Sequence, residues 1–305
     1  QRFMRKRLEN LVSQSLYEQG GLEILIIDSC SPQDERSIVE EFLPYHPQIR
    51  YVRTDERETV YGAWNRGISL ATGKYFINAN TDDQFSPRGL EILADLLDQN
   101  QEIDASYGDW IVTKIENDDI GSGPHQFVFL YPDFDAILFL YYQITTHAVM
   151  VRRTAFDLIG GYDDSLKVYG DRDWMFRFAT AGLKARHVPE IVGLYLESPT
   201  SVEHANPNAV SEWNILRERY FQPEMLALLA GHGDAPSSRI LAHEYARTGA
   251  AGHPYYHWNG VPCSDLAFAA RCFSVAMEQD SHNLVACHNA AVLLAHSGQR
   301  EEARA

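Results

Sequence analysis

Oxygen-bearing side chains follow a short apolar segment in a pattern that could bind a hard divalent cation. Residues 75–77 are Tyr, Phe and Ile, which suit a half-buried strand, and Asn80, Asp82 and Asp83 come soon after them. Mg²⁺ and Mn²⁺ prefer oxygen ligands, and ligands of open α/β sheets bind at the carboxyl ends of strands. The pattern therefore predicts a strand over 75–79 that leads to a metal site at Asp82 and Asp83. A solvated turn or a helix cap is the alternative.

The elements that must position these side chains alternate between strand and helix patterns. Apolar residues 24–27 predict a buried parallel strand, and residues 49–53 predict a second one. Helical patterns surround these strands at residues 3–15, 32–43 and 62–71. Such alternation is typical of a parallel sheet with helices on both faces. Further along the chain, residues 105–113 and 127–130 have shorter, β-rich patterns.

The last part of the chain differs, because its patterns are all helical. Ala-rich helical patterns cover residues 225–230, 240–247, 266–279 and 284–297. Ala290, Gly298 and Glu301 lie where the start of a tetratricopeptide repeat, a stacking helix pair of about 34 residues, has similar residues. We expect one domain over 1–220 and an all-α helical-repeat segment over 221–305. An unrelated helical cap is the alternative to repeats.

Composition argues against some classes of function. The chain has 305 residues, of which 45% are hydrophobic and 22% are charged, as in an ordinary globular protein. Its formal net charge of −16 argues against nucleic acid as a partner, because phosphate binding needs clustered Lys and Arg. No apolar run approaches the ~20 residues that a membrane-spanning helix needs. We expect a cytoplasmic protein, with the inner face of a membrane as the alternative location.

Five motifs occur in an order that is typical of one enzyme family. They occupy residues 23–31, 64–73, 73–83, 152–163 and 171–182. In this order they resemble a family 2 glycosyltransferase of the GT-A type, over roughly residues 3–200. The resemblance implies a GT-A nucleotide-diphospho-sugar transferase fold, an α/β fold with a mostly parallel sheet flanked by helices. It also implies a first strand ahead of these elements that this sequence lacks, so we expect an internal part of a longer protein.

The resemblance implies several residues that bind the donor. Asp28 would accept a hydrogen bond from the nucleotide base, commonly uracil, although Ser29 and Cys30 replace the usual Asp and Gly after it. A cap for the following helix is the alternative role of Asp28. Asn65 and Arg66 would also lie at the nucleotide-sugar, with Arg66 near the diphosphate. A surface ion pair is the alternative for Arg66.

The resemblance also gives roles to the acidic turn. Asp82 aligns with the second acid of the Asp-x-Asp motif and would bind Mn²⁺ or Mg²⁺, with Asp83 as a further ligand. Asn80 replaces the first acid, and its amide oxygen could accept from the ribose or bind the metal through water without adding charge. The metal would act as a Lewis acid on the departing diphosphate.

The catalytic base is expected just before an aromatic helix that ends at Gly182. Counting back from Arg177 places Asp171 on the family's base and Gly170 on the acid before it, with Asp173 as the second candidate. A carboxylate is ionised at neutral pH and can take a proton from an acceptor hydroxyl late in the transfer. In-line attack with such a base inverts the anomeric centre. A helix N-cap is the alternative role of Asp171.

The sequence therefore predicts a metal-dependent, inverting glycosyltransferase. It would move a sugar from a nucleotide-diphospho-sugar, with UDP-sugars expected first, to a hydroxyl of a glycan, a lipid-linked or a protein acceptor. A protein partner could bind the repeats. Three alternatives stay open: a GT-A domain that binds nucleotide-sugar or protein without catalysis, as Ser29, Asn80 and Gly170 indicate, a sugar-phosphate nucleotidyltransferase, and a repeat scaffold.

Overall fold

The structure, a computed structural model, consists of two compact units. It describes residues 2–123, 126–141, 145, 148–199, 205–233, 236–252, 257–258, 261–262, 265–299 and 303. The first unit comprises Gln1–Phe134, Thr145–Phe178 and Leu183–Trp213, and the second comprises Asp135–Ile144, Ala179–Gly182 and Asn214–Ala305. The second unit thus includes the segment Asp135–Ile144, which a single boundary near residue 220 would assign to the first domain. The division into 1–220 and 221–305 stays a prediction.

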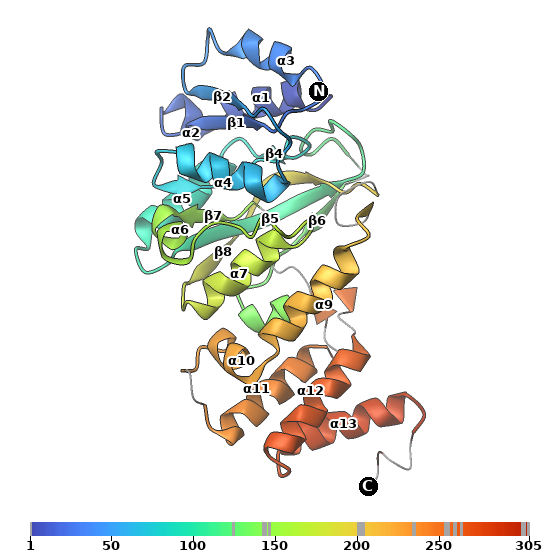
Figure 1. Cartoon of the computed structure of the whole chain (residues 1–305). Coiled ribbons are helices and arrows are strands. Elements are labelled where there is room, and N and C mark those ends of the chain that lie inside the picture. Colours follow the sequence, from blue (N-terminus) through green and yellow to red (C-terminus); the bar gives the residue numbers. More distant parts are fainter. Residues whose placement is uncertain are drawn as a thin grey trace. The chain divides into compact units, whose positions relative to one another are not determined.

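The first unit begins with a small parallel sheet and its helices (Figure 1). These elements are α1 Met4–Val12, α2 Ser15–Glu18, β1 Ile24–Asp28, α3 Glu35–Phe42 and β2 Ile49–Arg53. β1 and β2 pair in parallel with Ile24 opposite Ile49, as their apolar patterns predicted. α3 begins later than predicted, because the side chain of Asp34 caps it by accepting from the N–H of Ser37. α1 packs against α3 and buries Leu8.

The larger sheet of the first unit has six strands. They are β3 Tyr75–Phe76, β4 Gln84–Phe85, β5 Ala105–Thr113, β6 Phe127–Phe129, β7 Met150–Arg152 and β8 Ala185–Leu196. Their order is β3-β7-β5-β8-β4, and β6 pairs with β5. Within this sheet, as far as the structure describes it, β5 and β8 are parallel and the other neighbours are antiparallel.

The prediction of a mostly parallel sheet is wrong for this larger sheet. A buried strand has a similar apolar pattern whether its neighbours run parallel or antiparallel, so the pattern does not reveal direction. β7, which the sequence analysis missed, lies between β3 and β5 and runs antiparallel to both. β3 is shorter than the predicted strand, because the chain leaves the sheet after Phe76.

Five further described helices follow in the sequence, and two of them, α4 and α7, carry predicted site residues. They are α4 Val60–Leu70, α5 Gly89–Gln99, α6 Arg153–Ile159, α7 Gly170–Thr180 and α9 Ala209–Tyr220. α4 packs against β1, and α5 packs against β5 and β8. α4 begins earlier than predicted, because the hydroxyl of Thr59 caps it by accepting from the N–H of Gly62.

The second unit is built mainly from helices. Its described elements are η1 Ala136–Leu140, α10 Pro223–Leu229, α11 Ser238–Ala251, β9 His257–Trp258, β10 Val261–Pro262, α12 Leu266–Gln279 and α13 Leu284–His296. α11 packs against α12, where a Cβ on Gly249 would lie 2.7 Å from the ring of Phe273. The four predicted helices are present, and α12 has the predicted bounds. The tetratricopeptide assignment stays a prediction, and Glu301 lies outside the described residues. None of the described helices is long and apolar enough to cross a membrane.

Candidate functional site

The carboxylate of Asp28 is buried at the carboxyl end of β1. Its Oδ1 accepts from the N–H of Ser31 at 2.8 Å, and its Oδ2 accepts from Tyr51 and Arg53, both at 2.5 Å. Burial opposes ionisation of Asp28, but these three donors together hold its pKa below the usual range. Since a carboxylate has about four acceptor positions, about one is left for a nucleotide base. Asp28 does not cap α3, whose cap is Asp34.

The predicted metal site contains one exposed and one buried carboxylate. Asp82 is exposed in the turn before β4, and Asn80 lies half-buried just before it. Asp83 is only 2% exposed, and its Oδ1 accepts from the N–H of Leu196 at 3.1 Å. The carbonyl of Asp83 also accepts from Arg7 of α1 at 3.0 Å. Asp83 therefore ties the turn to β8 and α1, and its role as a metal ligand stays a prediction.

The residues of this turn fit a metal that is bound largely by the substrate. Within the described residues, no group of three or more His, Cys, Asp and Glu side chains could hold an ion. Mg²⁺ at nucleotide sites is commonly held by one or two carboxylates together with substrate phosphates. Asp82 supplies an exposed carboxylate of this kind, and Asn80 supplies an amide oxygen nearby in the chain.

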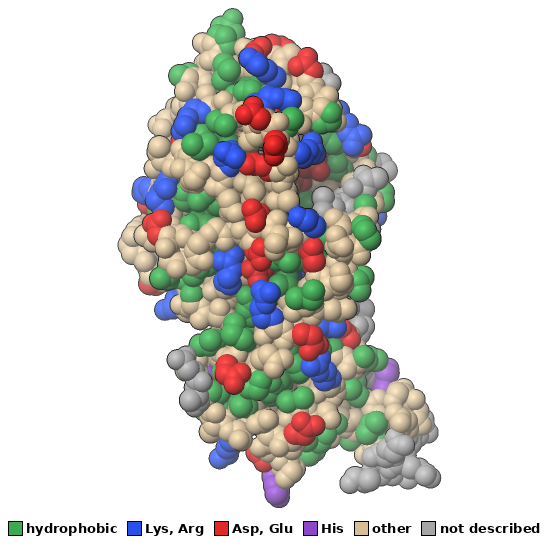
Figure 2. All heavy atoms as spheres, in the orientation of Figure 1, with side chains coloured by type: hydrophobic (Ala, Val, Ile, Leu, Met, Phe, Trp, Pro, Cys, Tyr) green, Lys and Arg blue, Asp and Glu red, His purple; other side chains and the backbone are tan. Residues whose placement is uncertain are grey.

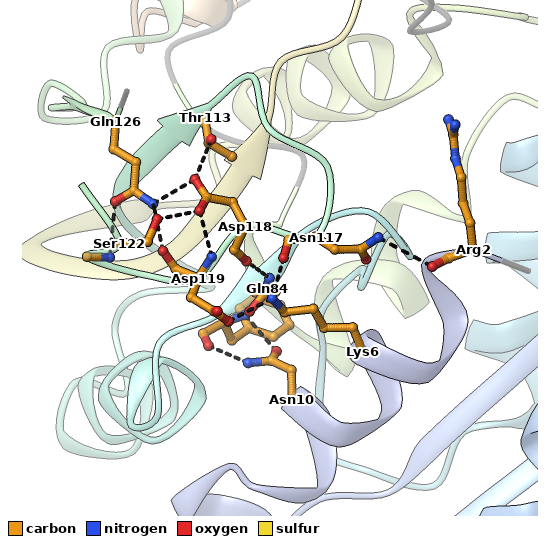
Figure 3. A network of polar contacts seen from close by, with 12 residues as sticks. Arg2, Lys6, Asn10, Gln84, Thr113, Asn117, Asp118, Asp119, Ser122 and Gln126 are labelled. Carbon is orange, nitrogen blue, oxygen red and sulfur yellow. Dashed lines mark hydrogen bonds and ion pairs between the residues drawn. The ribbon is translucent and has the colours of Figure 1, made fainter. Parts of the chain in front are cut away.

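A network of polar contacts fixes the strand that follows the turn (Figure 3). Gln84 of β4 donates to the carbonyl of Asp118 at 2.5 Å, and Lys6 of α1 forms an ion pair with Asp119 at 2.7 Å. Hydrogen bonds, foremost from the hydroxyl of Ser122, hold the pKa of Asp118 well below its usual range. The loop between β5 and β6 is thereby joined to α1 and β4, and it supports one side of the acidic turn.

Asn65 and Arg66 are neighbours on α4 with different surroundings. The amide of Asn65 donates to the carbonyl of Tyr162 and accepts from the N–H of the same residue, both at 2.8 Å. Its amide atoms therefore hold the loop between α6 and α7. Arg66 is exposed and forms an ion pair with Glu58, so it could reach a diphosphate only by leaving that carboxylate. Both donor roles stay predictions.

Asp171 and Asp173 both lie in the first turn of α7, but their partners differ. Asp171 is half-buried, and its Oδ1 accepts from the hydroxyl of Tyr61 at 3.3 Å and the N–H of Arg172 at 2.9 Å. Asp173 is 1% exposed and forms an ion pair with Arg177 at 2.9 Å. A substrate hydroxyl can reach a half-buried carboxylate more readily than a buried, paired one. The geometry thus favours Asp171 over Asp173 as the candidate base.

Aromatic rings join α4, α7 and the loop between α6 and α7. The ring centroid of Tyr162 lies 5.9 Å from that of Tyr61, 5.2 Å from Trp64 and 5.8 Å from Trp174. The indole N–H of Trp174 donates to the carbonyl of Gly160 at 2.8 Å. Because buried aromatic side chains fix one another's orientation, this aromatic cluster gives the start of α7 a rigid support.

The segment that leads to the acidic turn contacts this aromatic cluster. Asn78 lies between β3 and Asp82, and its amide donates to the hydroxyl of Tyr162 at 3.1 Å. The ring of Tyr162 lies beside that of Tyr61, whose hydroxyl contacts Asp171. Burial raises the pKa of Tyr162, and the negative charge of Asp171 acts in the same direction. We define the candidate active site as Asp28, Asn78, Asp82, Tyr162 and Asp171.

The sequence analysis missed a buried carboxylate that binds the backbone just before α7. The carboxylate of Glu212 on α9 is buried and accepts from the N–H groups of Lys167 (2.8 Å), Val168 (2.8 Å) and Tyr169 (3.2 Å). Successive N–H groups around one anion form a backbone nest. A single acid on a helix carries no pattern that would have revealed this contact.

The charged side chains of the surface are mixed in sign. On the face drawn in Figure 2, basic and acidic side chains are interspersed. Nucleic acid binding instead requires basic side chains gathered in a patch or stripe. The absence of a nucleic acid partner stays a prediction from the net charge.

Comparison with known proteins shows the family. Residues 1–160 match the description "Glycosyl transferase family 2". The chain belongs to glycosyl transferase family 2. The predicted family and the predicted class of enzyme are thereby confirmed.

Similar sequences are glycosyltransferases and a synthase. A PGL/p-HBAD biosynthesis glycosyltransferase of Mycobacterium bovis (strain BCG / Pasteur 1173P2) is 28% identical over 180 residues. The match covers 58% of this chain and 66% of the relative, so the chain spans slightly less than two thirds of that protein. A chondroitin synthase of Escherichia coli is 21% identical over 215 residues, which are 70% of this chain and 29% of the synthase.

Solved structures share the fold of this family 2 chain. S. aureus TarS 1-349 in complex with UDP-GlcNAc has a TM-score of 0.61 and 13% identity, covering 99% of this chain and 85% of TarS 1-349. The mannosyltransferase PcManGT from Pyrobaculum calidifontis, in complex with GDP-Man and Mn²⁺, has a TM-score of 0.52 and 18% identity. That match covers 97% of this chain and 75% of the mannosyltransferase. These likenesses confirm a GT-A-like fold.

Proposed function

We propose that this chain transfers a sugar from a nucleotide-diphospho-sugar to an acceptor hydroxyl, with inversion at the anomeric carbon. The observation that carries the proposal is the contact of Asn78 with Tyr162. It joins the segment that leads to the exposed Asp82 with the aromatic cluster beside Asp171. Glycosyl transfer needs a group that binds the donor and a base that takes the acceptor's proton. This contact connects the regions that would supply them within the first unit.

The proposed reaction uses Asp171 as the base. Its carboxylate takes the proton of the acceptor hydroxyl while the hydroxyl oxygen bonds to the anomeric carbon. The bond from that carbon to the diphosphate breaks, and its electron pair leaves with the nucleoside diphosphate. Because nucleophile and leaving group occupy opposite faces of the carbon, the product has the inverted configuration. The acceptor would be a hydroxyl of a glycan, of a lipid-linked substrate or of a protein.

The donor is proposed to bind between β1 and the acidic turn. Asp28 would accept from the nucleotide base, with Tyr51 and Arg53 fixing its carboxylate. Asp82 and Asn80 would hold Mn²⁺ or Mg²⁺, which supplies positive charge to the leaving diphosphate when it is bound. A UDP-sugar is the first donor class to test, since TarS is described in complex with UDP-GlcNAc. A GDP-sugar is the second, since the mannosyltransferase is described with GDP-Man.

A second function, binding of a nucleotide-sugar without catalysis, has its own support. Asn65 is committed to the backbone of Tyr162. Asn80 and Gly170 lack the charge that the family motifs carry at these positions. The following experiment separates the two functions, because binding and turnover are measured on the same protein.

The experiment is calorimetric titration of UDP, GDP and dTDP, each with and without Mn²⁺. We expect one nucleotide to bind in a Mn²⁺-dependent way, and Asp82→Ala to weaken this binding by about tenfold or more, equivalent to ~1.4 kcal/mol. Asp95→Ala, which removes an exposed acid of α5, is the matched control and should bind normally. Unchanged affinity in Asp82→Ala would refute the donor site. Binding without nucleotide release from the corresponding sugar donor would favour the second function.

A further inference from the structure

We propose that Tyr61 is a positioning residue for the candidate base: its ring occupies the space left open by Gly170, and its hydroxyl holds the carboxylate of Asp171. This inference rests on the proposed function, because it explains how the surroundings of Asp171 prepare it for proton transfer. Tyr61 lies on α4 and Asp171 lies on α7, so the contact joins two helices that are distant in the sequence.

The hydroxyl of Tyr61 is surrounded by the chain that begins α7. Tyr61 is 3% exposed, and its hydroxyl donates to the carbonyl of Val168 and lies 3.3 Å from Oδ1 of Asp171. One phenol oxygen thus contacts both the backbone just before α7 and the carboxylate of the base.

The single proton of this hydroxyl has two acceptors within reach. It can go to the carbonyl of Val168 or to the carboxylate of Asp171. Hydrogen bonds to a charged acceptor are stronger, so the contact with Asp171 gains strength when the carboxylate is ionised and ready to act. Burial, helped by the charge of Asp171, raises the pKa of Tyr61 far above its ordinary value. The phenol therefore stays protonated and stays a donor.

The position of the Tyr61 ring requires that residue 170 has no side chain. A Cβ built on Gly170 would lie 2.7 Å from two carbons of the Tyr61 ring. A side chain at position 170 would therefore force the ring away from Asp171. The family motif has an acid at this position, and here the ring of Tyr61 occupies the space beside it.

The ring of Tyr61 is held independently of its hydroxyl. Its centroid lies 5.4 Å from that of Trp64 in an edge contact and 5.9 Å from that of Tyr162. A phenylalanine at position 61 can keep these contacts, because it retains the ring. Tyr61→Phe therefore removes the hydroxyl and little else. Among the described residues, Tyr162 of the preceding loop also senses the charge of Asp171, and the charged side chains of Arg172, Asp173 and Arg177 follow Asp171 on α7.

The test compares Tyr61→Phe with the wild-type chain in the presence of Mn²⁺. The reaction is release of nucleoside diphosphate from UDP-GlcNAc and from GDP-mannose, with water as the acceptor. We expect kcat to fall about tenfold, as for loss of one hydrogen bond to a charged group. The acid limb of the kcat–pH profile should move upward by up to about one unit, because a carboxylate that loses a donor is protonated more easily. The affinity for the nucleotide should not change.

Tyr107→Phe is the matched control. Tyr107 of β5 is fully buried, and its hydroxyl donates to the carbonyl of Pro132 at 2.7 Å. Its loss removes a similar buried hydrogen bond without touching α7, so we expect a lower stability but an unshifted acid limb. Gly170→Ala is the second variant, and the displaced ring should lower kcat while the nucleotide still binds.

The possible outcomes separate this inference from the proposed function. A wild-type kcat and acid limb in Tyr61→Phe, or an equal shift in Tyr107→Phe, would overturn the positioning role while glycosyl transfer stands. A wild-type kcat in Gly170→Ala would overturn the dependence of the ring on Gly170. If the wild-type chain binds a nucleotide but releases none from either donor, the proposed function fails and the inference fails with it.

Discussion

The base side and the donor side of the candidate site are built differently. On the base side, buried or half-buried side chains hold the backbone before α7 at several points. These side chains are Asn65, Trp174, Arg177 and Glu212. On the donor side, Asp82 is exposed in a turn and Arg66 lies in a surface ion pair. The base is thus organised by the fold itself, whereas Asp82 and Arg66 on the donor side have room to adjust to a ligand.

This difference follows from where each kind of contact is stable. Hydrogen bonds from buried side chains to the backbone keep one geometry, because breaking one leaves a buried polar group without a partner. Surface ion pairs are screened by water and contribute little. Proton transfer requires accurate placement of the base, while a metal and a diphosphate can draw mobile groups together.

The largest expected effect is on the base side. Asp171→Asn should lower kcat by about 10²–10⁴-fold, because the amide cannot accept the proton of the acceptor. Nucleotide affinity, measured by calorimetry, should stay at the wild-type value. Asp164→Asn is the matched control, because Asp164 is an exposed acid in the loop between α6 and α7. If Asp171→Asn kept its kcat, the base side would be only a structural support.

A smaller effect tests whether the base side is the more rigid. Glu212→Gln keeps the shape of the side chain but has one oxygen for the three N–H groups that the carboxylate accepts. We expect the free energy of unfolding to fall by about 2–3 kcal/mol, measured by urea denaturation. On the donor side, Arg66→Met should leave this free energy nearly unchanged, because the ion pair with Glu58 is at the surface. Equal losses in both variants would contradict the comparison.

The smallest effect concerns Asp28, a buried carboxylate of the donor side. Its folded-state pKa is lowered, so its contribution to stability is present above the unfolded pKa, near ~3.9, and is lost as pH falls through the folded-state pKa. The stability difference between wild type and Asp28→Asn should therefore be constant near neutral pH and become smaller below about pH 4. Urea denaturation at a series of pH values measures it. A difference that stays constant down to pH 2 would contradict the pairing with Tyr51 and Arg53.

The sequence predicts the parts of the site that follow local patterns. Asp28, Asp82 and Asp171 were predicted because each lies next to an apolar strand or an aromatic helix within a motif, and their roles stay predictions. The sequence could not show that Asp82 is exposed and Asp83 is buried. The burial of two adjacent acids depends on the direction of the strand that follows them, and the sequence does not give that direction. Among the described elements, most helices and β5 were predicted close to their bounds, because their periodic patterns are long.

Contacts between distant residues could not be predicted. Tyr61 and Asp171 are 110 positions apart, and Glu212 and Val168 are 44 apart. Both pairs meet through tertiary packing within the first unit, and a single sequence contains no trace of that packing. β7 was missed for a different reason. Its three residues are too few to show an alternating pattern.

The buried carboxylate of Glu212 has a consequence for how the chain before α7 can open. A local opening there would break three hydrogen bonds at once and leave their buried polar groups without these partners. Segments held in this way open at a free energy close to that of global unfolding, whereas exposed turns open at a much lower one. The placement of the candidate base is therefore as durable as the fold around it.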